Sequence, residues 1–575
     1  MKDVRAGLRG IGRTVFHGQK IEDFQVEIIG VMENPGPKQS VILARLSGGP
    51  LAETGVLEGM SGSPVYIDGK LVGAVALGFA FSKETIAGIQ PIEQMLSDGT
   101  FNAPQVARGS FDLVHTAGSW LDWMDLPSRA NIPLPSGNLT EILTPISCSG
   151  FTPAALAVFA SDFRKLGFEP QEGVSGVVSS SQTSSAAASR PLEPGSMISV
   201  ALLSGDMSVR ADGTVTYIKG NRVYAFGHQF LDAGTTELPF ARSEVIGLLP
   251  NLNMSFKISA AGPWLGTITS DRSTAIAGEI GRPSHTIPLS IGVHAATGAR
   301  TYQFQVVNDR LLTPFLTQTA IFSVMDAADR TLGAGTLRLS GRVEFQNGVP
   351  PLIIKDVFVS DSGLAQQAAM DAVVSLGFAL GGDFADLRVA NITFDLDARE
   401  TKRQLQIAQA WTSAHQIHPG DGVQITAVLA GTNGVEFTRT ATYRVPVGAP
   451  AGLLNFTISD ANGLNFPEFA GLTPGSFRTP ERLIGTLNEF RGSDAAYVRV
   501  WRQQPSFSVS GPATRGELSD PPPSVTLILA NASSSVSASS LLTLTRGADI
   551  AELSLPVTGY AVIGGARTVQ VEVVE

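Results

Sequence analysis

Short extended runs broken by turn residues recur along most of this 575-residue chain, and they restrict the fold more than any other feature. Runs such as FQVEIIGVM (residues 24–32) and SVILARLS (residues 40–47) are rich in β-branched residues, which favour strands. The chain has 61 glycines and 34 prolines, which supply the turns between such runs. We therefore expect a mainly β protein.

Length, charge and cysteine content narrow the class of protein further. A chain this long exceeds what one hydrophobic core normally holds, so several domains are expected. Its formal net charge of −10 argues against a nucleic-acid partner. No apolar run reaches the ~18 residues of a membrane helix, and the first 16 residues lack the apolar segment of a signal peptide. Because Cys148 is the only cysteine, an internal disulfide is excluded.

The segment LEGMSGSPVYIDGKLVGAV (residues 57–75) has the chemistry of a nucleophile loop followed by a β-hairpin that turns at Asp68-Gly69. A serine hydroxyl needs a nearby base and hydrogen-bond donors for the developing oxyanion. Gly59 can turn its N–H toward a pocket, and the N–H of Ser61 would point the same way, so these two residues are the predicted oxyanion hole. On spacing alone, a small-residue turn between strands explains the segment equally well.

The wider context of this loop resembles the SpoIVB peptidase (S55) family, bacterial serine endopeptidases of the trypsin-like clan. The resemblance lies within residues 4–96, in the segments GLRGIGRTVFHGQKIEDFQVEIIGV, RLSGGPLAETGVLEGMSGSPVYIDGKLVGAVALGFAFSKE and IAGIQPIEQML. It implies Ser61 as the nucleophile and a protein or peptide substrate, with self-cleavage as in some relatives. We expect no cofactor and no metal, since His415 and His418 have a metal-like gap but no third ligand nearby.

The same family carries a histidine in an apolar-Gly-His context, and VYAFGHQFLD (residues 223–232) places His228 in one. A histidine at a strand end after a glycine can turn toward a cleft, although an isolated one is more often a structural imidazole. Together with Ser61, the resemblance favours His228 as the general base. Its segment follows the serine segment here, which reverses the family order and looks like a circular permutation. Such reversals are physically allowed because one catalytic geometry recurs with different chain orders.

The third catalytic group is left open by the sequence. The acid usually proposed for the family precedes the nucleophile, but residues 45–50 contain no carboxylate. Asp271 follows His228 at about the His-to-Asp separation of a chymotrypsin-type barrel, which makes it the first candidate. Asp232 is an alternative, and a Ser–His dyad without a carboxylate is a third.

The trypsin-like alignment also predicts a substrate pocket. Its walls would come from residues 76–78 and 87–89, in particular Leu77, Gly78 and Gly88. No acid stands near Gly55 at the expected pocket floor. A small or apolar residue before the scissile bond therefore fits better than Arg or Lys.

The predicted fold consists of two trypsin-like β-barrels in permuted order, followed by C-terminal β-sandwich-like domains. The second barrel is expected to contain hairpin turns at Asp212-Gly213 and Gly220-Asn221. The predicted boundaries are 1–99 for the serine barrel, 100–194 for a connector with a short helix after Thr152 and a Ser-rich linker (179–189), 195–305 for the histidine barrel, 306–384 for a β segment plus a helix (362–380), 385–460 for a β-sandwich, and 461–575 for a C-terminal β region.

Three functional interpretations follow from these features. The first is a serine endopeptidase of narrow specificity that acts in processing or signalling. The second is a catalytically inactive protease-fold scaffold with β-sandwich interaction domains, and the third is an adhesin-like β protein. For a bacterial protease of this kind we expect an extracytoplasmic location with the leader missing from this sequence, while a cytoplasmic one stays open.

Overall fold

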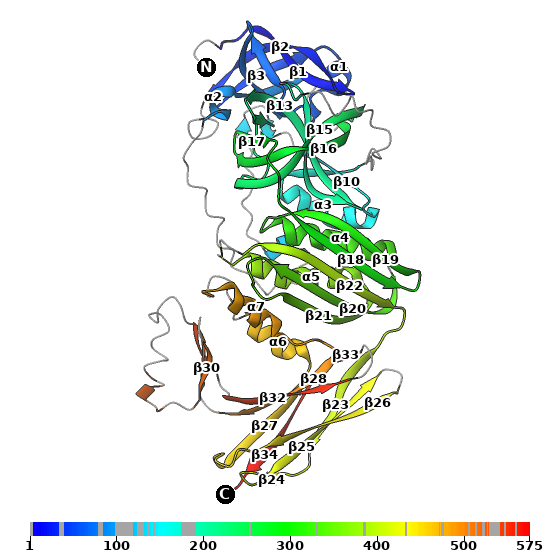
Figure 1. Cartoon of the computed structure of the whole chain (residues 1–575), viewed down its shortest axis with the longest axis vertical. Helices are drawn as coiled ribbons and strands as arrows, with labels where there is room; N and C mark the ends of the chain where they lie inside the picture. Colours follow the sequence, from blue (N-terminus) through cyan, green and yellow to red (C-terminus); the bar gives the residue numbers. More distant parts are fainter. Residues whose placement is uncertain are drawn as a thin grey trace. The chain divides into compact units, whose positions relative to one another are not determined.

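The protein is mainly β, as predicted, and divides into two compact units (Figure 1). Unit 1 comprises residues 1–109, 121–288 and 303–323, and unit 2 comprises residues 110–120, 289–302 and 324–575. The computed structural model describes residues 4–33, 39–78, 84–97, 119–123, 132–134, 137–141, 144–173, 191–251, 255–328, 332–382, 384, 387–431, 434–470, 472, 477–503, 506–511, 514–519, 522, 524–525, 527, 541–545, 548–557 and 561–575. The Ser-rich linker predicted at 179–189 lies outside these residues.

The first barrel of unit 1 is a closed ring of antiparallel strands, because β5 pairs with both β1 and β6. Alternate strand residues such as Phe24, Val26 and Ile42 fill its interior. The β5–β6 hairpin turns at Asp68 and Gly69 as predicted, and both residues have positive φ, 48° and 74°. The order of strands around the ring is β5 (Pro64–Ile67), β1 (Arg9–His17), β2 (Lys20–Glu33), β3 (Ser40–Ser47), β7 (Ile86–Pro91) and β6 (Lys70–Gly78). Two short helices, α1 (Leu51–Thr54) and α2 (Ile92–Met95), accompany the ring. Outside the ring, β9 (Gly137–Glu141) pairs with β6, and β8 (Ile132–Leu134) pairs with β9.

The second barrel is also a closed ring, since β12 pairs with both β13 and β15. The predicted turn at Gly220 is confirmed, but the one predicted at Asp212-Gly213 is wrong, because β13 continues through these residues. The ring order is β12 (Met197–Gly205), β13 (Ser208–Lys219), β14 (Arg222–Ala225), β17 (Ala275–Ile280), β16 (Ser255–Arg272) and β15 (Gly234–Leu249).

Tertiary packing explains why β13 does not turn. Asp212 is buried, and Oγ of Ser259 on β16 donates a hydrogen bond of 2.5 Å to its Oδ2. A side chain on Gly213 would collide with the ring of Phe226, 2.2 Å from its Cε1. The Asp-Gly pair therefore serves packing rather than a reversal.

The two barrels contact each other directly within unit 1. The two-residue strand β4 (Leu57–Glu58) pairs in parallel with β16, and Gly18 bridges Val245 of β15. This contact lies next to the Ser61 loop, so the loop is fixed between the barrels.

Helices and further strands complete unit 1. Helix α3 (Pro153–Lys165) begins as predicted after Thr152, whose hydroxyl accepts a hydrogen bond from the Ala155 N–H. Phe159 of α3 packs edge-on against Phe315 of α4 (Leu312–Ala328). Helix α4 is not predictable from the sequence pattern, because its apolar residues lie on all sides and give no amphipathic period. The other strands here are β10 (Thr144–Ser149) and β11 (Phe168–Glu172). The 3₁₀ turn η1 (Trp120–Trp123) and β19 (Gly298–Val307) have residues in both units.

Unit 2 begins with a sheet and a helix. Strands β22 (Val389–Arg399), β20 (Leu332–Phe345) and β21 (Leu352–Ser362) pair in that order, and β18 (Thr286–Ala295) joins β22 in parallel. Helix α5 (Leu364–Leu380) packs on β20 and β21. It confirms the helix predicted at 362–380.

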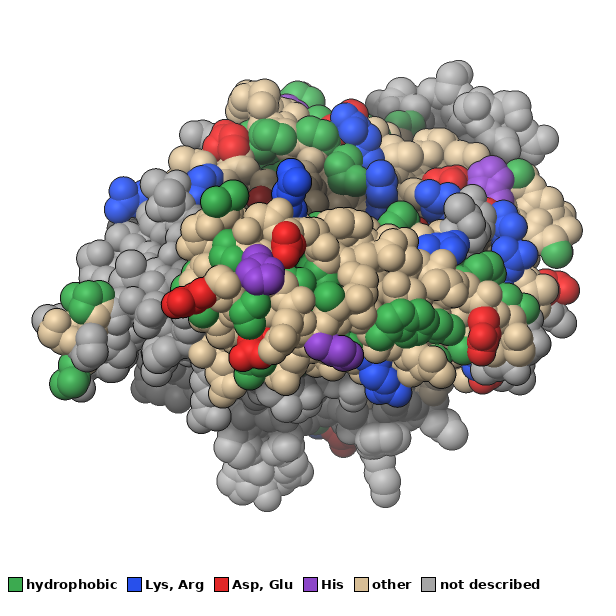
Figure 2. Space-filling model, turned by 90° about the horizontal axis from the view of Figure 1, so that it is seen from below, with side chains coloured by type: hydrophobic (Ala, Val, Ile, Leu, Met, Phe, Trp, Pro, Cys, Tyr) green, Lys and Arg blue, Asp and Glu red, His purple; other side chains and the backbone are tan. Residues whose placement is uncertain are grey.

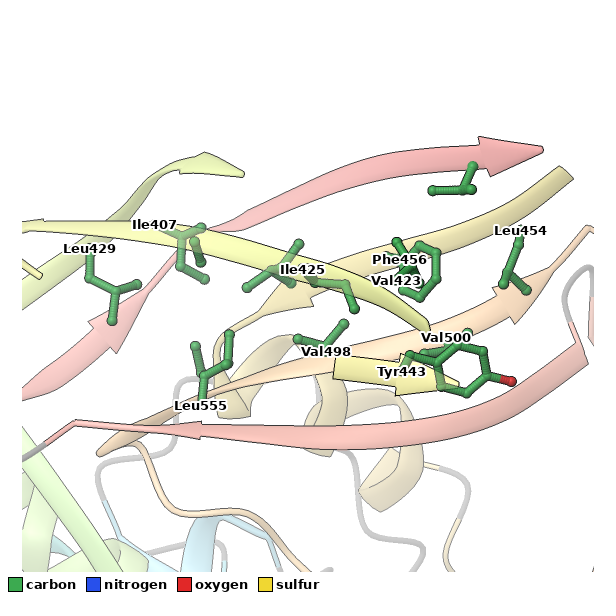
Figure 3. Packing of buried hydrophobic residues seen from close by; sticks show 14 of the residues in the cluster. Ile407, Val423, Ile425, Leu429, Tyr443, Leu454, Phe456, Val498, Val500 and Leu555 are labelled. Atoms are coloured by element: carbon green, nitrogen blue, oxygen red, sulfur yellow. The ribbon is translucent and has the colours of Figure 1, made fainter. Parts of the chain in front are cut away.

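A β-sandwich follows, and Figure 3 shows Ile425, Phe456 and Val500 among the side chains packed between its two sheets. Both of the predicted C-terminal stretches, 385–460 and 461–575, contribute strands to it. One sheet consists of β26 (Glu436–Arg444), β25 (Gly422–Gly431), β23 (Gln404–Thr412) and β33 (Val562–Gly564), and the other of β24 (Gln416–Ile417), β34 (Ala566–Val573), β27 (Gly452–Ser459), β28 (Ala495–Arg502) and β32 (Ala548–Pro556). Further elements are α6 (Ala461–Ala470), α7 (Pro480–Asn488), β29 (Ser506–Gly511), β30 (Thr514–Ser519) and β31 (Leu541–Thr545).

The face of the molecule seen in Figure 2 carries side chains of mixed character. On the face seen in Figure 2, acidic and basic side chains are interspersed with scattered apolar ones. Within the described part of the chain, no helix combines the length and the apolar character that crossing a membrane requires.

Candidate active site

The Ser61 loop is a compact turn between β4 and β5. Gly59 and Gly62 both have positive φ, 89° and 90°, which a residue with a side chain rarely adopts. The N–H of Met60 bonds to the Leu57 carbonyl at 3.0 Å, and the N–H of Gly62 bonds to the Val75 carbonyl at 2.7 Å. To the described residues, neither the N–H nor the hydroxyl of Ser61 makes a hydrogen bond. The loop thus presents the buried Ser61 hydroxyl beside the available N–H of the same residue.

The second barrel holds this loop through three hydrogen bonds from β13. The Thr214 N–H donates to the Ser61 carbonyl at 2.8 Å, and the Thr214 hydroxyl donates to the Gly59 carbonyl at 2.9 Å. The Thr216 hydroxyl donates to the Gly62 carbonyl at 2.7 Å. Three of the four carbonyls from Gly59 to Gly62 are therefore fixed by the neighbouring barrel.

Gly62 lies very close to the backbone of the second barrel. A Cβ on Gly62 would lie 2.0 Å from the Thr214 carbonyl oxygen and 2.5 Å from the backbone nitrogen of Phe226. Phe226 is two residues before His228. The fold therefore brings the Ser61 loop and the predicted histidine segment into contact, although more than 160 residues separate them in the chain.

The histidine segment leaves β14 through two unusual backbone conformations. Phe226 and Gly227 both have positive φ, 69° and 73°, and such strain in a phenylalanine is characteristic of constrained functional segments. A Cβ on Gly227 would lie 3.2 Å from Cβ of Ala76 and 3.3 Å from Cβ of Ala74, both on β6 of the first barrel. His228 follows this close approach and is 2% exposed.

The hydrogen bond of the His228 ring determines its neutral tautomer. Nδ1 lies 2.6 Å from the Gln229 carbonyl oxygen, which can only accept. Nδ1 therefore carries the proton, and in the neutral ring Nε2 carries the lone pair that a general base needs. Nε2 of His228 and the Ser61 hydroxyl are not hydrogen-bonded to each other in this structure.

Asp271, the first sequence candidate for the third group, lies at the end of β16 and is fully buried. Its Oδ1 accepts a hydrogen bond from the Phe230 N–H at 2.7 Å, and its Oδ2 accepts bonds from Leu231 at 2.6 Å and Ala233 at 3.2 Å. Burial raises the pKa of Asp271 to about 6, and these backbone bonds oppose the rise. Both carboxylate oxygens thus anchor the loop that follows His228.

The other sequence candidates are less constrained. Asp232 has a φ of 58° in the same loop and is exposed. The predicted pocket residues Leu77 and Gly88 lie opposite each other on β6 and β7, and Gly78 follows at the end of β6. A Cβ on Gly88 would lie 2.8 Å from Cβ of Leu77, so Gly88 allows these strands to pack closely.

Two buried ionisable groups beside the Ser61 loop, Glu58 and Lys257, were not predicted from the sequence. Glu58 is 1% exposed, and burial together with the nearby Glu169 raises its pKa to about 8. Lys257 on β16 is 3% exposed, and burial lowers its pKa to about 7, against the opposing charge of Asp212. The sequence gives no sign that Lys257 is buried, because on this stretch of β16 the polar residues face inward and the apolar residues between them are partly exposed.

In the comparison with known proteins, the part of the chain that gave a match is the one that forms the first barrel. No curated protein and no solved structure gave a significant match to the chain. Residues 1–96, which contain Ser61 and the strands of the first barrel, match the family of SpoIVB peptidase S55, as the sequence resemblance predicted.

Proposed function

We propose that this protein is a serine endopeptidase in which Ser61 is the nucleophile and His228 is the general base. One observation carries the proposal: the segment that contains His228 packs on the Gly-Met-Ser-Gly loop, with Gly62 against the backbone of Phe226. The loop lies within the residues that match a serine peptidase family. Two closed barrels that meet at this loop suit a trypsin-like arrangement in permuted order.

The proposed reaction uses the groups already described. Nε2 of His228 takes the proton from the Ser61 hydroxyl as its Oγ attacks the peptide carbonyl carbon. The N–H groups of Gly59 and Ser61 stabilise the oxyanion. His228 then gives its proton to the leaving amine, and water hydrolyses the acyl-enzyme by the same steps in reverse roles.

A second candidate function is a non-catalytic binding protein built on the same barrels. The observation that favours it is burial, since Ser61 is only 1% and His228 only 2% exposed. A peptide substrate needs access to both groups, so an active enzyme has to open at this place. A scaffold protein needs no such opening.

Labelling with a fluorophosphonate probe separates the two candidates. In the reaction, Ser61 Oγ forms a bond to phosphorus, fluoride leaves, and His228 takes the hydroxyl proton. We expect labelling of the full chain, mapped to Ser61 by mass spectrometry and abolished in Ser61→Ala. Ser63→Ala is the matched control, because Ser63 is equally buried in the same loop and should leave labelling intact. A chain that is not labelled while trypsin is labelled would favour the scaffold.

The role of Asp271 is predicted from its three backbone hydrogen bonds. Asparagine offers only one acceptor oxygen, so Asp271→Asn should destabilise the loop by about 1–3 kcal/mol. Through this loop we expect kcat to fall roughly 10- to 100-fold, less than the ~10⁴ expected of the same change in a Ser-His-Asp triad. Steady-state kinetics and thermal unfolding measure the two effects. A loss near 10⁴ at unchanged stability would instead make Asp271 the catalytic acid.

A further inference from the structure

Lys257 is a buried lysine beside the Ser61 loop. On β16 the polar residues Ser255, Lys257 and Ser259 are buried, whereas Phe256 and Ile258 between them are partly exposed. The lysine stem lies against Gly59, where a Cβ would be 3.3 Å from Cδ of Lys257. Lysine is almost never buried without a specific partner. Its partners therefore indicate what it does.

The amino group of Lys257 reaches from the second barrel to two acceptors in the first. Nζ donates to Oγ1 of Thr14 on β1 at 2.7 Å and lies 3.4 Å from the Gly59 carbonyl oxygen. The same carbonyl accepts the Thr214 hydroxyl at 2.9 Å. Two donors of the second barrel thus converge on one carbonyl oxygen of the Ser61 loop.

The protonation state of Lys257 does not remove these bonds. Burial lowers its pKa to about 7, and Asp212 on β13 opposes the fall. A charged amino group carries three N–H donors and a neutral one carries two, so either form can serve both acceptors.

The Met60 N–H bond to the Leu57 carbonyl holds the peptide unit of the Gly59 carbonyl from inside the loop, and Lys257 and Thr214 add a hold from the second barrel. Gly59 itself offers little resistance to rotation. It has no side chain and a φ of 89°, so its backbone can rotate more freely than that of other residues. Because a peptide unit is planar, rotation of the Gly59 carbonyl also turns the N–H of Met60 and shifts the chain that leads to Ser61. When the Gly59 carbonyl is held by the second barrel, the N–H groups of Gly59 and Ser61 keep one orientation relative to each other.

We infer that Lys257 is a positioning residue, which together with Thr214 holds the Gly59 carbonyl and so orients the N–H groups of Gly59 and Ser61 toward the oxyanion. The inference rests on the proposed function. It predicts that loss of the amino group weakens stabilisation of the transition state and leaves ground-state binding nearly unchanged.

The test is the kinetics of fluorophosphonate reaction with Lys257→Met, which keeps most of the apolar stem and removes the amino group. We expect the maximal rate of inactivation to fall roughly 10- to 100-fold, with the probe's half-saturating concentration within about threefold of the wild type. Thr14→Val is the matched control, since it removes the other acceptor of Nζ and spares the Gly59 carbonyl. Its maximal rate should stay within about threefold.

Two outcomes would overturn the inference. One is a Lys257→Met variant with the wild-type maximal rate, even if it melts earlier, and the other is an equal loss in Thr14→Val. If Lys257→Met does not fold, Thr214→Val removes the second donor to the Gly59 carbonyl and leaves the buried amino group in place. This variant should likewise lower the maximal rate of inactivation and leave the half-saturating concentration of the probe nearly unchanged. A wild-type chain that never reacts at Ser61 would refute the proposed function itself, which is a separate result.

Discussion

Alanine at either Ser61 or His228 is expected to lower kcat for peptide hydrolysis by roughly 10⁴–10⁶, and the double variant should be little worse than either single one. The reason is that nucleophile and base act as one unit, so the first substitution already removes most of their joint effect. The residual rate would come from substrate binding and the oxyanion donors alone.

An internally quenched peptide library measures this effect, because its mixed sequences cover many cleavage-site preferences at once. His285→Ala is a suitable control, because His285 also follows a strand of the second barrel but is largely exposed and bonded to Glu237. It should keep wild-type activity. Retention of most activity by His228→Ala would mean that another residue is the base, and strictly additive losses would mean that the two groups act independently.

The largest effect on stability is expected from Gly62→Ala, which should destabilise the contact between the barrels by more than about 4 kcal/mol. The new Cβ would sit 2.0 Å from the Thr214 carbonyl oxygen and 2.5 Å from the Phe226 nitrogen. Both neighbours are backbone atoms of the second barrel, so no side-chain rotation can relieve the clash. Loop and barrel have to separate.

Gly69→Ala isolates this clash from backbone strain. Gly69 also has a positive φ, 74°, but nothing lies within 4 Å of its virtual Cβ, so it should cost only about 1–2 kcal/mol. Hydrogen–deuterium exchange of the full chain measures the two effects separately. Exchange over residues 208–219 reports on the contact between the barrels, and exchange over residues 64–78 reports on the hairpin that contains Gly69. Equal exchange behaviour of the two variants would contradict the close packing at Gly62.

The elements that could be predicted from the sequence are those that depend only on neighbouring residues. The strand SVILARLS, residues 40–47, is predictable because a run with β-branched residues favours a strand whatever its distant partners are. Helix α3 was predicted from the Thr152 cap and Pro153, whose effects depend only on neighbouring residues. The Asp68-Gly69 turn was likewise predictable, since positive φ at both positions needs no distant partner.

The predictions that were wrong or missing concern residues whose conformation or burial depends on contacts with residues far away in the sequence. Asp212-Gly213 has the composition of a turn, but the partners that keep it extended, Ser259 and Phe226, come from elsewhere in the second barrel. Lys257 alternates with Phe256 and Ile258, and this pattern predicts an exposed lysine, whereas the barrel buries it. Of the candidate site, the sequence could therefore indicate Ser61 and His228 as residues, but not the threonines and the lysine that hold their surroundings.

The order of the two barrels has a consequence for synthesis on the ribosome. The Ser61 loop is complete early, whereas the second barrel closes only when β17 and its neighbours have left the exit tunnel, roughly 200 residues later. At ~5–20 residues per second, this delay lasts on the order of 10–40 s. During that interval Thr214, Lys257 and His228 are not yet in place around the loop. With Ser61 and His228 as nucleophile and base, a nascent chain therefore cannot cut its own emerging segments or neighbouring polypeptides until most of unit 1 has been made.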